Sequence, residues 1–412
     1  MNVLLILFFV LIAFSFIYNA VKSYQEYLKK QRNPGTVRKG AQLVVADPYT
    51  GSKLAPNVST FIQRAITKEH FYTNDLGFRV ERKGLKQSVP VDIAFIGCSW
   101  VMGVGVEYEQ TYVYKVSKML NANVANLGVG TYSITQAIRI LEKNIDLLKP
   151  RIIVYSFLNG HISRDFRTNT FEGILRRPIY VYYKNKKKIQ IMEPRYNPSN
   201  KCLETYSYYK MYPSIPHDYS FKDIYGYTIR QIIKLNSMVS NGAITNLILK
   251  RLGLKRWRYG DSYLEENRKT VINDAISRLH HLSQKYSSKV LIHNLFHYKM
   301  LDMHNKQSVR DKYKADTKKD LELFGKAIKS EGAKDIFFVS IDQEKELYDN
   351  WSKKNGFKYG HYLEAIHLPD TNHPNEIGNG IIAESIAKQI KQNMPRFRAR
   401  MACPSSLYHP QG

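Results

Sequence analysis

The stretch VDIAFIGCSWVMGVGV, residues 91–106, decides the fold. Its first part, residues 91–97, is a continuous apolar run of the kind that is buried on both faces of a parallel sheet. A tight Gly-Cys-Ser turn follows and places Ser99 at the carboxyl end of the strand, where its hydroxyl and its backbone amide can face a substrate. Glycine and serine also occur in many strand-to-helix turns merely to turn the chain and cap the helix. Taken alone, this stretch is therefore weak evidence for a nucleophile.

The alternation of strand and helix repeats along the chain after residue 91. Four further apolar runs have the length of buried strands, and stretches with helical periodicity lie between them. We expect an α/β fold with five strands in a doubly wound, mostly parallel sheet, because right-handed crossovers place helices on both faces. The further strands are expected at 123–128, 151–158, 289–296 and 335–341, and the helices at about 109–121, 133–147, 264–286, 316–331 and 375–392.

An apolar run occupies the N-terminus, where residues 3–18 read VLLILFFVLIAFSFIY and Ser15 is the one break. This length approaches what a helix needs to cross a hydrocarbon core. We therefore predict a single transmembrane anchor over residues 1–21, which would make the protein a single-pass membrane protein. A cleaved signal peptide is the alternative, but no lysine or arginine precedes the run and Tyr18-Asn19-Ala20 is a poor cleavage site.

The segment that follows the apolar run, residues 22–56, is polar and basic and contains prolines at 34, 48 and 56. It is predicted to be a juxtamembrane linker with little helix or strand of its own. Its lysines and arginines would hold the domain in the cytoplasm by the positive-inside rule. The folded domain is expected over residues 57–395, with a tail at 396–412.

Composition limits the class of protein. The chain has 412 residues and 43% hydrophobic residues, which is enough for a globular core. Lysine and arginine total 62 against 35 acidic residues, and the net charge of +27 predicts a surface that attracts anions such as lipid headgroups, acidic glycans or nucleic acid. The three cysteines, Cys98, Cys202 and Cys403, form neither a disulfide framework nor a cysteine-rich zinc pattern. A disordered chain and a disulfide scaffold are thus excluded.

A long segment at about 160–263 interrupts the α/β pattern and is rich in tyrosine and lysine. It includes KNKKK at 184–188 and KRLGLKRWR at 250–258. Because it leaves the carboxyl end of a central strand, it is an insertion at the edge where open α/β sheets bind ligands. It is either a lid or substrate platform, or a solvated basic excursion.

A second motif lies near the end of the chain in HLPDTNHPNEIG, residues 367–378. Asp370 and His373 stand three residues apart there. In a helical turn or compact loop this spacing brings the two side chains together, so that a carboxylate can hold the imidazole tautomer while the other ring nitrogen faces a hydroxyl. His373 is thus a candidate general base for Ser99.

Two strand ends supply candidate donors for an oxyanion. Gly128 follows the second strand in Asn-Leu-Gly, and Asn159 follows the third strand in Leu-Asn-Gly. A glycine amide and an asparagine side chain can both donate to an oxyanion without adding a charge. Each tripeptide alone is an ordinary turn.

These segments together resemble the SGNH hydrolases, the GDSL-like esterase superfamily, over about residues 72–390. YTNDLGFR at 72–79 also looks like the Asn-x-x-Gly-Phe-Arg lead-in of many bacterial members. The matches run through all four blocks of the family: Ser99 is similar to the first-block serine, Gly128 to the second-block glycine, Asn159 to the third-block asparagine, and Asp370 with His373 to the closing Asp-x-x-His.

The resemblance implies a three-layer α/β/α domain of flavodoxin-like topology that cleaves or transfers an ester-linked acyl group on a lipid, a glycan or a small ester. It favours a periplasmic or extracytoplasmic domain, against the charge rule above. His373 would take the Ser99 proton, Asp370 would stabilise the imidazolium, and Ser99, Gly128 and Asn159 would hold the oxyanion. Water would then release the acyl group, whereas an acceptor sugar would make the same site an O-acyltransferase. No metal or cofactor is required.

Two positions depart from the family pattern. Cys98 and Gly160 stand where the family usually has aspartate, in the first block and after the third-block asparagine. Neither position is catalytic in the mechanism that the resemblance implies. Cys98 is itself a rival thiol nucleophile, although a small buried residue behind the turn is the commoner role of such a cysteine.

Three other readings compete with a serine hydrolase. His361, His367, Asp370 and His373 could form a metal site, but the chain has no HExxH pattern. LKRWRYG at 254–260 interleaves aromatic and basic residues as single-strand nucleic-acid binders do, yet no recognised nucleic-acid motif is present, so no nucleic-acid partner is expected. A non-catalytic anchored protein that binds an anionic or acylated polymer is the third, and the intact serine, histidine and aspartate argue against it.

Overall fold

The computed structural model describes most of the expected domain. The described residues are 37–40, 43–63, 67–158, 160–165, 178–183, 188–192, 196–197, 202–203, 261–295, 307–339, 341–356, 366–368, 373–395 and 397. The predicted anchor at 1–21, the basic stretch at 250–258 and all of the expected tail except residue 397 lie outside them. No helix among the described residues is long and apolar enough to cross a membrane.

The centre of the domain is the predicted five-stranded sheet, and all five strands run parallel. Their spatial order is β15-β14-β9-β7-β8, which is the flavodoxin-like doubly wound order. Successive strands are added toward one edge of the sheet from β7 to β8 and toward the other edge from β9 onward, so the order of the strands reverses between β7 and β9. Ligands of such sheets bind at the carboxyl ends of the strands beside this switch point. The strands are β7 (Ile93–Ile96), β8 (Val124–Asn126), β9 (Ile152–Phe157), β14 (Lys289–Asn294) and β15 (Ile336–Val339).

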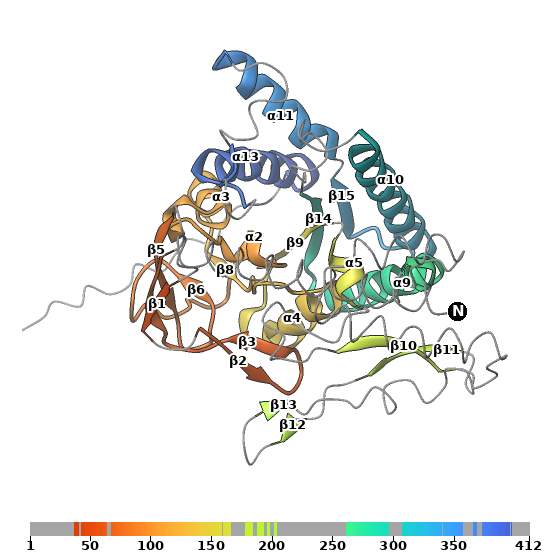
Figure 1. Ribbon diagram of the computed structural model, residues 1–412, viewed down its shortest axis with the longest axis horizontal. Helices are drawn as coiled ribbons and strands as arrows, with labels where there is room; N and C mark the ends of the chain where they lie inside the picture. The colour runs from red at the N-terminus through yellow and green to blue at the C-terminus, as the bar shows by residue number, and fades with distance from the viewer. Residues whose placement is uncertain are drawn as a thin grey trace, which may run out of the picture.

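Helices cover both faces of this sheet and complete three layers (Figure 1). One layer consists of α3 (Tyr112–Leu120), α11 (Ile341–Lys354) and α13 (Glu376–Asn393), and the other of α4 (Ile134–Leu148), α9 (Asp261–Tyr286) and α10 (Gln307–Ser330). The five predicted helices are all present. Helix α11 was not predicted, and it begins at Ile341, the last residue of the expected fifth strand.

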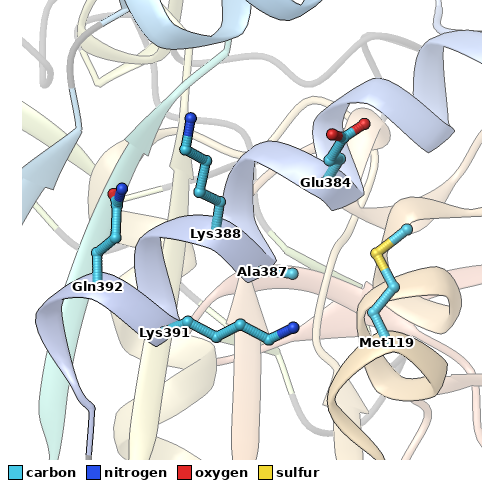
Figure 2. Close-up of a pocket in the computed structure, with 6 residues that line it drawn as sticks. All are labelled: Met119, Glu384, Ala387, Lys388, Lys391 and Gln392. Atoms are coloured by element: carbon cyan, nitrogen blue, oxygen red, sulfur yellow. The ribbon is translucent and has the colours of Figure 1, made fainter.

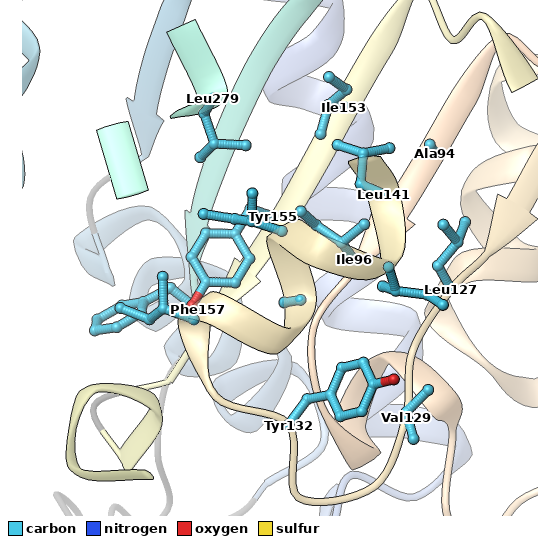
Figure 3. Packing of buried hydrophobic residues seen from close by; sticks show 14 of the residues in the cluster. Ala94, Ile96, Leu127, Val129, Tyr132, Leu141, Ile153, Tyr155, Phe157 and Leu279 are labelled. Carbon is cyan, nitrogen blue, oxygen red and sulfur yellow. The ribbon is translucent and has the colours of Figure 1, made fainter. Parts of the chain in front are cut away.

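Side-chain alternation along the strands divides the core between the two layers. On β7, Ile93 and Phe95 belong to the cluster that contains α3 and α13 residues, whereas Ala94 and Ile96 belong to the cluster that contains α4 and α9 residues. Figure 3 shows Ala94 and Ile96 beside Leu141 of α4. The unbroken apolar run thus reflects burial on both faces, as expected for a central parallel strand.

The N-terminal part differs from the expectation. Residues 22–56 were predicted to form a linker with little strand, but within the described residues 37–40 and 43–56 they form three strands, so the fold begins before residue 57. Prolines 48 and 56 lie in turns outside these strands and so do not interrupt them. An antiparallel sheet has the order β1-β4-β5-β6, and β2 pairs with β3: β1 (Val37–Gly40), β2 (Val44–Asp47), β3 (Gly51–Leu54), β4 (Ser59–Gln63), β5 (Lys68–Thr73) and β6 (Arg79–Val80).

The β2–β3 hairpin is fixed to helix α4 by hydrogen bonds. Gln136 of α4 donates its side-chain amide to the Thr50 carbonyl at 2.7 Å, and the Tyr132 hydroxyl just before α4 donates to the Ser52 carbonyl. Lys143 forms an ion pair with the buried Asp47. These tertiary contacts, rather than local propensity, hold the hairpin on the domain.

The described parts of the insertion are short. They comprise α5 (Gly160–Arg164), the hairpin β10 (Ile179–Tyr183) with β11 (Lys188–Met192), the pair β12 (Tyr196–Asn197) with β13 (Cys202–Leu203), and the start of α9. Its role as a lid or platform stays a prediction.

Candidate active site

Ser99 stands where the sequence predicted, at the carboxyl edge of the parallel sheet. It is the first residue of the short helix α2 (Ser99–Met102), which directly follows β7. Gly97 makes this turn possible, because its φ is +154° and a Cβ there would lie 2.5 Å from Val101 Cγ2 and 3.0 Å from the Ser156 carbonyl oxygen. The backbone amide of Ser99 has no acceptor within its own helix, since it is the first residue.

The structure brings His373 to Ser99 across 274 residues of sequence. His373 Nε2 lies 2.8 Å from Ser99 Oγ, which is hydrogen-bond distance. Both side chains are partly exposed, so the pair is open to solvent. A neutral imidazole with its proton on Nδ1 accepts the hydroxyl proton at Nε2, which is the arrangement of a nucleophile with its general base.

A short backbone bridge holds His373 in place. The Leu368 amide donates to the His373 carbonyl at 2.7 Å, and the Asn375 amide donates to the Ile366 carbonyl at 3.0 Å. Because these bonds join two segments on either side of the loop, the histidine backbone cannot move independently of residues 366–368.

Helix α13 adds a second restraint. The Asn375 side chain caps the helix by accepting from the amides of Ile377 and Gly378 at 3.0 and 3.1 Å. One turn later, the buried Asn379 donates to the Pro374 carbonyl at 2.9 Å and accepts from the Tyr112 amide at 2.9 Å. Asn379 therefore joins the histidine turn to the start of α3. Asn379 was not predicted from the sequence, and its one signal there was its position six residues after His373.

Trp100 forms one wall beside the pair. It is buried, and its ring centroid lies 6.5 Å from that of His373 and 5.7 Å from that of His367. Among the described residues, no group of three or more histidine, cysteine, aspartate or glutamate side chains could hold a metal ion. His361 and Asp370, two members of the suggested metal cluster, lie outside that part of the chain.

Gly128 lies directly against helix α2, which begins at Ser99. A Cβ at this position would be 2.3 Å from the Met102 backbone nitrogen, so only glycine allows this approach. Its amide donates to Asn126 Oδ1 at 3.0 Å, and Asn126 Nδ2 donates to the Val101 carbonyl at 2.9 Å. The predicted oxyanion donor is thus engaged with a side chain, and a bound oxyanion must share or displace that contact.

The other two predicted site residues, Asn159 and Asp370, lie outside the described residues. Their roles as oxyanion donor and as partner of the imidazole stay predictions. Strand β9 ends at Phe157 on the same sheet edge as Ser99, which is where the sequence placed Asn159.

Cys98 is fully buried behind the turn, and its sulfur lies 4.0 Å from Ser99 Oγ. It belongs to the apolar cluster that includes Phe95 and Val101. A buried thiol cannot meet a substrate, so the geometry favours Ser99 over Cys98 as the nucleophile.

A second serine–histidine pair occurs in the core and offers a useful contrast. His293 Nε2 lies 3.1 Å from Ser385 Oγ, and both residues are fully buried. Burial lowers the pKa of His293 to about 3, which keeps the imidazole neutral. His293 and Ser385 are within hydrogen-bond distance but closed to substrate, whereas Ser99 and His373 are within hydrogen-bond distance and partly exposed.

A surface hollow between α3 and α13 is separate from this site (Figure 2). It contains neither Ser99 nor His373, and it is lined by Met119, Glu384, Ala387, Lys388, Lys391 and Gln392. Ser99 and His373 lie instead at the carboxyl edge of the sheet next to the switch point.

No family model matches the chain, and no curated protein matches it. Among solved structures, a putative GDSL-like lipase from Bacteroides ovatus is 11% identical, with 89% of this chain and 76% of that one covered and a TM-score of 0.38. The chain is similar to it. An acetyl xylan esterase from Butyrivibrio proteoclasticus is 9% identical, with 84% and 73% covered and a TM-score of 0.34. A catalytic mutant of an acetylxylan esterase from Geobacillus stearothermophilus is 10% identical, with 73% and 94% covered and a TM-score of 0.32.

Proposed function

We propose that this protein is an SGNH-type serine hydrolase that cleaves an ester-linked acyl group, with Ser99 as nucleophile and His373 as general base. The observation that carries the proposal is the distance of 2.8 Å between Ser99 Oγ and His373 Nε2 at the carboxyl edge of β7. Nucleophile and base within hydrogen-bond reach, in a partly exposed turn, are the minimum that acyl transfer to serine requires.

The first half of the reaction makes an acyl-enzyme. Ser99 Oγ attacks the ester carbonyl carbon while His373 Nε2 takes the hydroxyl proton, and the carbonyl oxygen becomes an oxyanion. The tetrahedral intermediate collapses as the carbon–oxygen bond to the alcohol breaks, and His373 returns the proton to that alcohol. Water then attacks the acyl-enzyme by the same steps and releases the acid. We assign to Asp370 the role of holding the imidazole during both halves.

Stabilisation of the oxyanion is proposed to come from the Ser99 amide, the Gly128 amide and the Asn159 side chain. The Ser99 amide is the first in α2 and has no intrahelical acceptor. Each such donor contributes about 3 kcal/mol to the transition state in serine hydrolases. The Gly128 contribution is smaller if Asn126 Oδ1 keeps its share of that proton.

The substrate class proposed is an O-acetyl group on a glycan or a lipid ester. The net charge of +27 supports an anionic polymer or lipid surface as the carrier of the ester. Anchoring by residues 1–21 is part of the same proposal. Alkaline extraction of membranes tests the anchor. The full chain should stay in the membrane pellet, whereas a variant lacking residues 1–21 should be found in the supernatant. Release of the full chain would contradict the anchor.

Labelling with a fluorophosphonate probe tests the catalytic assignment. The folded wild type should be labelled and should hydrolyse p-nitrophenyl acetate, and both properties should be lost in Ser99→Ala and His373→Ala. Ser385→Ala is the matched control, since Ser385 also pairs with an imidazole but is fully buried. An unlabelled, folded wild type, or labelling that persists in Ser99→Ala, would contradict the proposal.

A further inference from the structure

Arg79, on β6, is fully buried and binds the loop that follows the nucleophile helix. Its guanidinium donates to the carbonyls of Met102 at 2.8 Å and Val106 at 2.7 Å, and also to that of Gly103. Three backbone acceptors within five residues are thus held by one rigid side chain. An arginine fork suits this task better than a lysine, because its donors are fixed in a plane.

Glu69, on β5, binds the same loop from the acceptor side. Its Oε2 accepts from the Gly105 amide at 2.7 Å and lies 3.8 Å from Arg79 Nη2, and both side chains are fully buried. The Arg79 guanidinium also stacks over the Phe71 ring at 4.4 Å. Glu69 and Arg79 therefore fix the backbone of residues 102–106 through donors and acceptors together, and each compensates the buried charge of the other.

The loop is bonded to Ser99 on one side. The amides of Gly103 and Val104 donate to the Ser99 carbonyl at 3.0 and 3.1 Å. A displacement of the loop would therefore be transmitted to the nucleophile through its own carbonyl.

On its other side the loop supports His373. A Cβ at Gly105 would lie 2.3 Å from Leu368 Cδ1, so the leucine side chain rests directly on the loop backbone. The Leu368 amide in turn donates to the His373 carbonyl at 2.7 Å. The loop 102–106 thus binds the Ser99 carbonyl and also contacts Leu368, which is bonded to His373.

We propose that the buried Glu69–Arg79 pair is a positioning element that sets the Ser99–His373 distance through the loop 102–106. The proposal rests on the hydrolase function proposed above, and it assigns no contact with substrate to either residue. Misplacement of reacting groups by about 1 Å costs on the order of 100-fold in rate without changing how the remote parts of a substrate bind. Loss of the pair should therefore lower kcat far more than it raises KM.

The test compares Arg79→Lys and Glu69→Gln with the wild type in p-nitrophenyl acetate hydrolysis and in the rate of fluorophosphonate labelling. We expect Arg79→Lys to lower kcat and the labelling rate by roughly 10- to 100-fold, with KM within about 3-fold of wild type. Glu69→Gln keeps an oxygen that accepts from the Gly105 amide. Glu69→Gln should therefore retain clearly more activity than Glu69→Ala. If removal of the charge were the whole effect, the two variants would lose activity equally.

Arg278→Lys is the matched control. Arg278 makes a bidentate pair with Glu142 at 2.9 and 2.6 Å, joining α9 to α4 away from the loop 102–106. Arg278→Lys should keep kcat within about 2-fold of the wild-type value. If Arg79→Lys does not fold, as judged by a thermal melt, Leu368→Ala replaces it as the test. Leu368 is partly exposed, so its loss should be tolerated by the fold, and losing its contact with Gly105 should lower kcat about 10-fold.

The outcomes separate the two proposals. A wild type labelled at Ser99 together with a folded Arg79→Lys of normal kcat and labelling rate would overturn the positioning role and leave the hydrolase function standing. Equal losses in Arg79→Lys and Arg278→Lys would also overturn it, as a general effect of stability. A folded wild type with neither labelling nor turnover would overturn both.

Discussion

At the scale of single residues, Gly128 shows how closely the end of β8 approaches helix α2. Its role was expected to be the donation of a backbone amide, yet its steric role is as direct, because a Cβ would meet the Met102 backbone at 2.3 Å. Backbone atoms cannot yield as the end of a flexible side chain can. The glycine is therefore required by packing as well as by chemistry.

Gly128→Ala should push α2 away from its strand edge and lower kcat for ester hydrolysis by at least 10-fold, with a loss of about 1–3 kcal/mol in unfolding free energy from overpacking. Gly130→Ala is the control in the same loop, since its Cβ would meet only Met102 Cε at 3.9 Å. Steady-state kinetics and urea denaturation of both variants measure the effect. Equal behaviour of the two alanine variants would contradict it.

The chemistry at this scale was readable from the sequence only in part. Ser99 and His373 were paired because Ser99 follows a strand, Asp370 and His373 stand three residues apart, and both segments resemble blocks of the SGNH hydrolases. The structure places Ser99 Oγ and His373 Nε2 2.8 Å apart. The bond from the Gly128 amide to Asn126 Oδ1 spans only two residues and is a local Asx turn, which asparagine commonly forms. The bond from Asn126 Nδ2 to the Val101 carbonyl could not be predicted, because it depends on how the loop after β8 closes on α2.

At the scale of elements, α13 does more than cover the sheet. Its first turns carry Asn375, which caps the helix, and Asn379, which binds both the histidine turn and the start of α3. A buried amide that donates and accepts in this way locks two segments with one side chain. The helix thereby fixes the turn that carries His373.

Asn379→Ala should lower kcat by roughly 10-fold and the unfolding free energy by about 1–3 kcal/mol, because it leaves a buried amide and carbonyl without a partner from this residue. Asn393→Ala, at the exposed end of the same helix, should change neither by a measurable amount. Kinetics and denaturation on the two variants distinguish a fixed histidine turn from a general weakening of α13.

Elements in the α/β part were predictable because buried parallel strands are unbroken apolar runs, as at Ile152–Phe157. The N-terminal strands were missed for the opposite reason. The β2 strand is only partly buried for most of its length, and its stability comes from contacts with α4 such as the Gln136 bond to Thr50. Helix α11 was missed because few of its described side chains are buried, with Tyr348 and Ser352 the ones that face the domain.

At the scale of the whole molecule, buried histidines make stability depend on pH. Burial lowers the pKa of His293 to about 3, and burial together with the nearby Arg164 lowers that of His161 well below its ordinary value. The folded state therefore holds both rings neutral, while the unfolded chain takes up protons near pH 6.5. Below that pH the unfolded state binds more protons, so stability is full above about 6.5 and falls as the pH drops toward 3.

We expect the unfolding free energy to fall by about 2 kcal/mol between pH 7.5 and pH 5 on account of His293 alone. Urea midpoints at the two pH values measure this. His293→Gln should flatten the dependence, and His70→Gln, whose parent side chain is 56% exposed, should not. An unchanged pH slope in His293→Gln would show that this imidazole is not the source.

The docking of the β2–β3 hairpin on α4 and the pairing of β1 with β4 also limit the length of the linker between the predicted anchor and the domain. If residues 1–21 anchor the protein, residues 22–36 can span at most roughly 50 Å before the first strand begins. The sheet edge that carries Ser99 would then stay within a thin layer above the bilayer and would meet ester groups by diffusion in two dimensions. Lengthening this linker with a flexible insert should then allow hydrolysis of acyl groups farther from the membrane without altering the chemistry at Ser99.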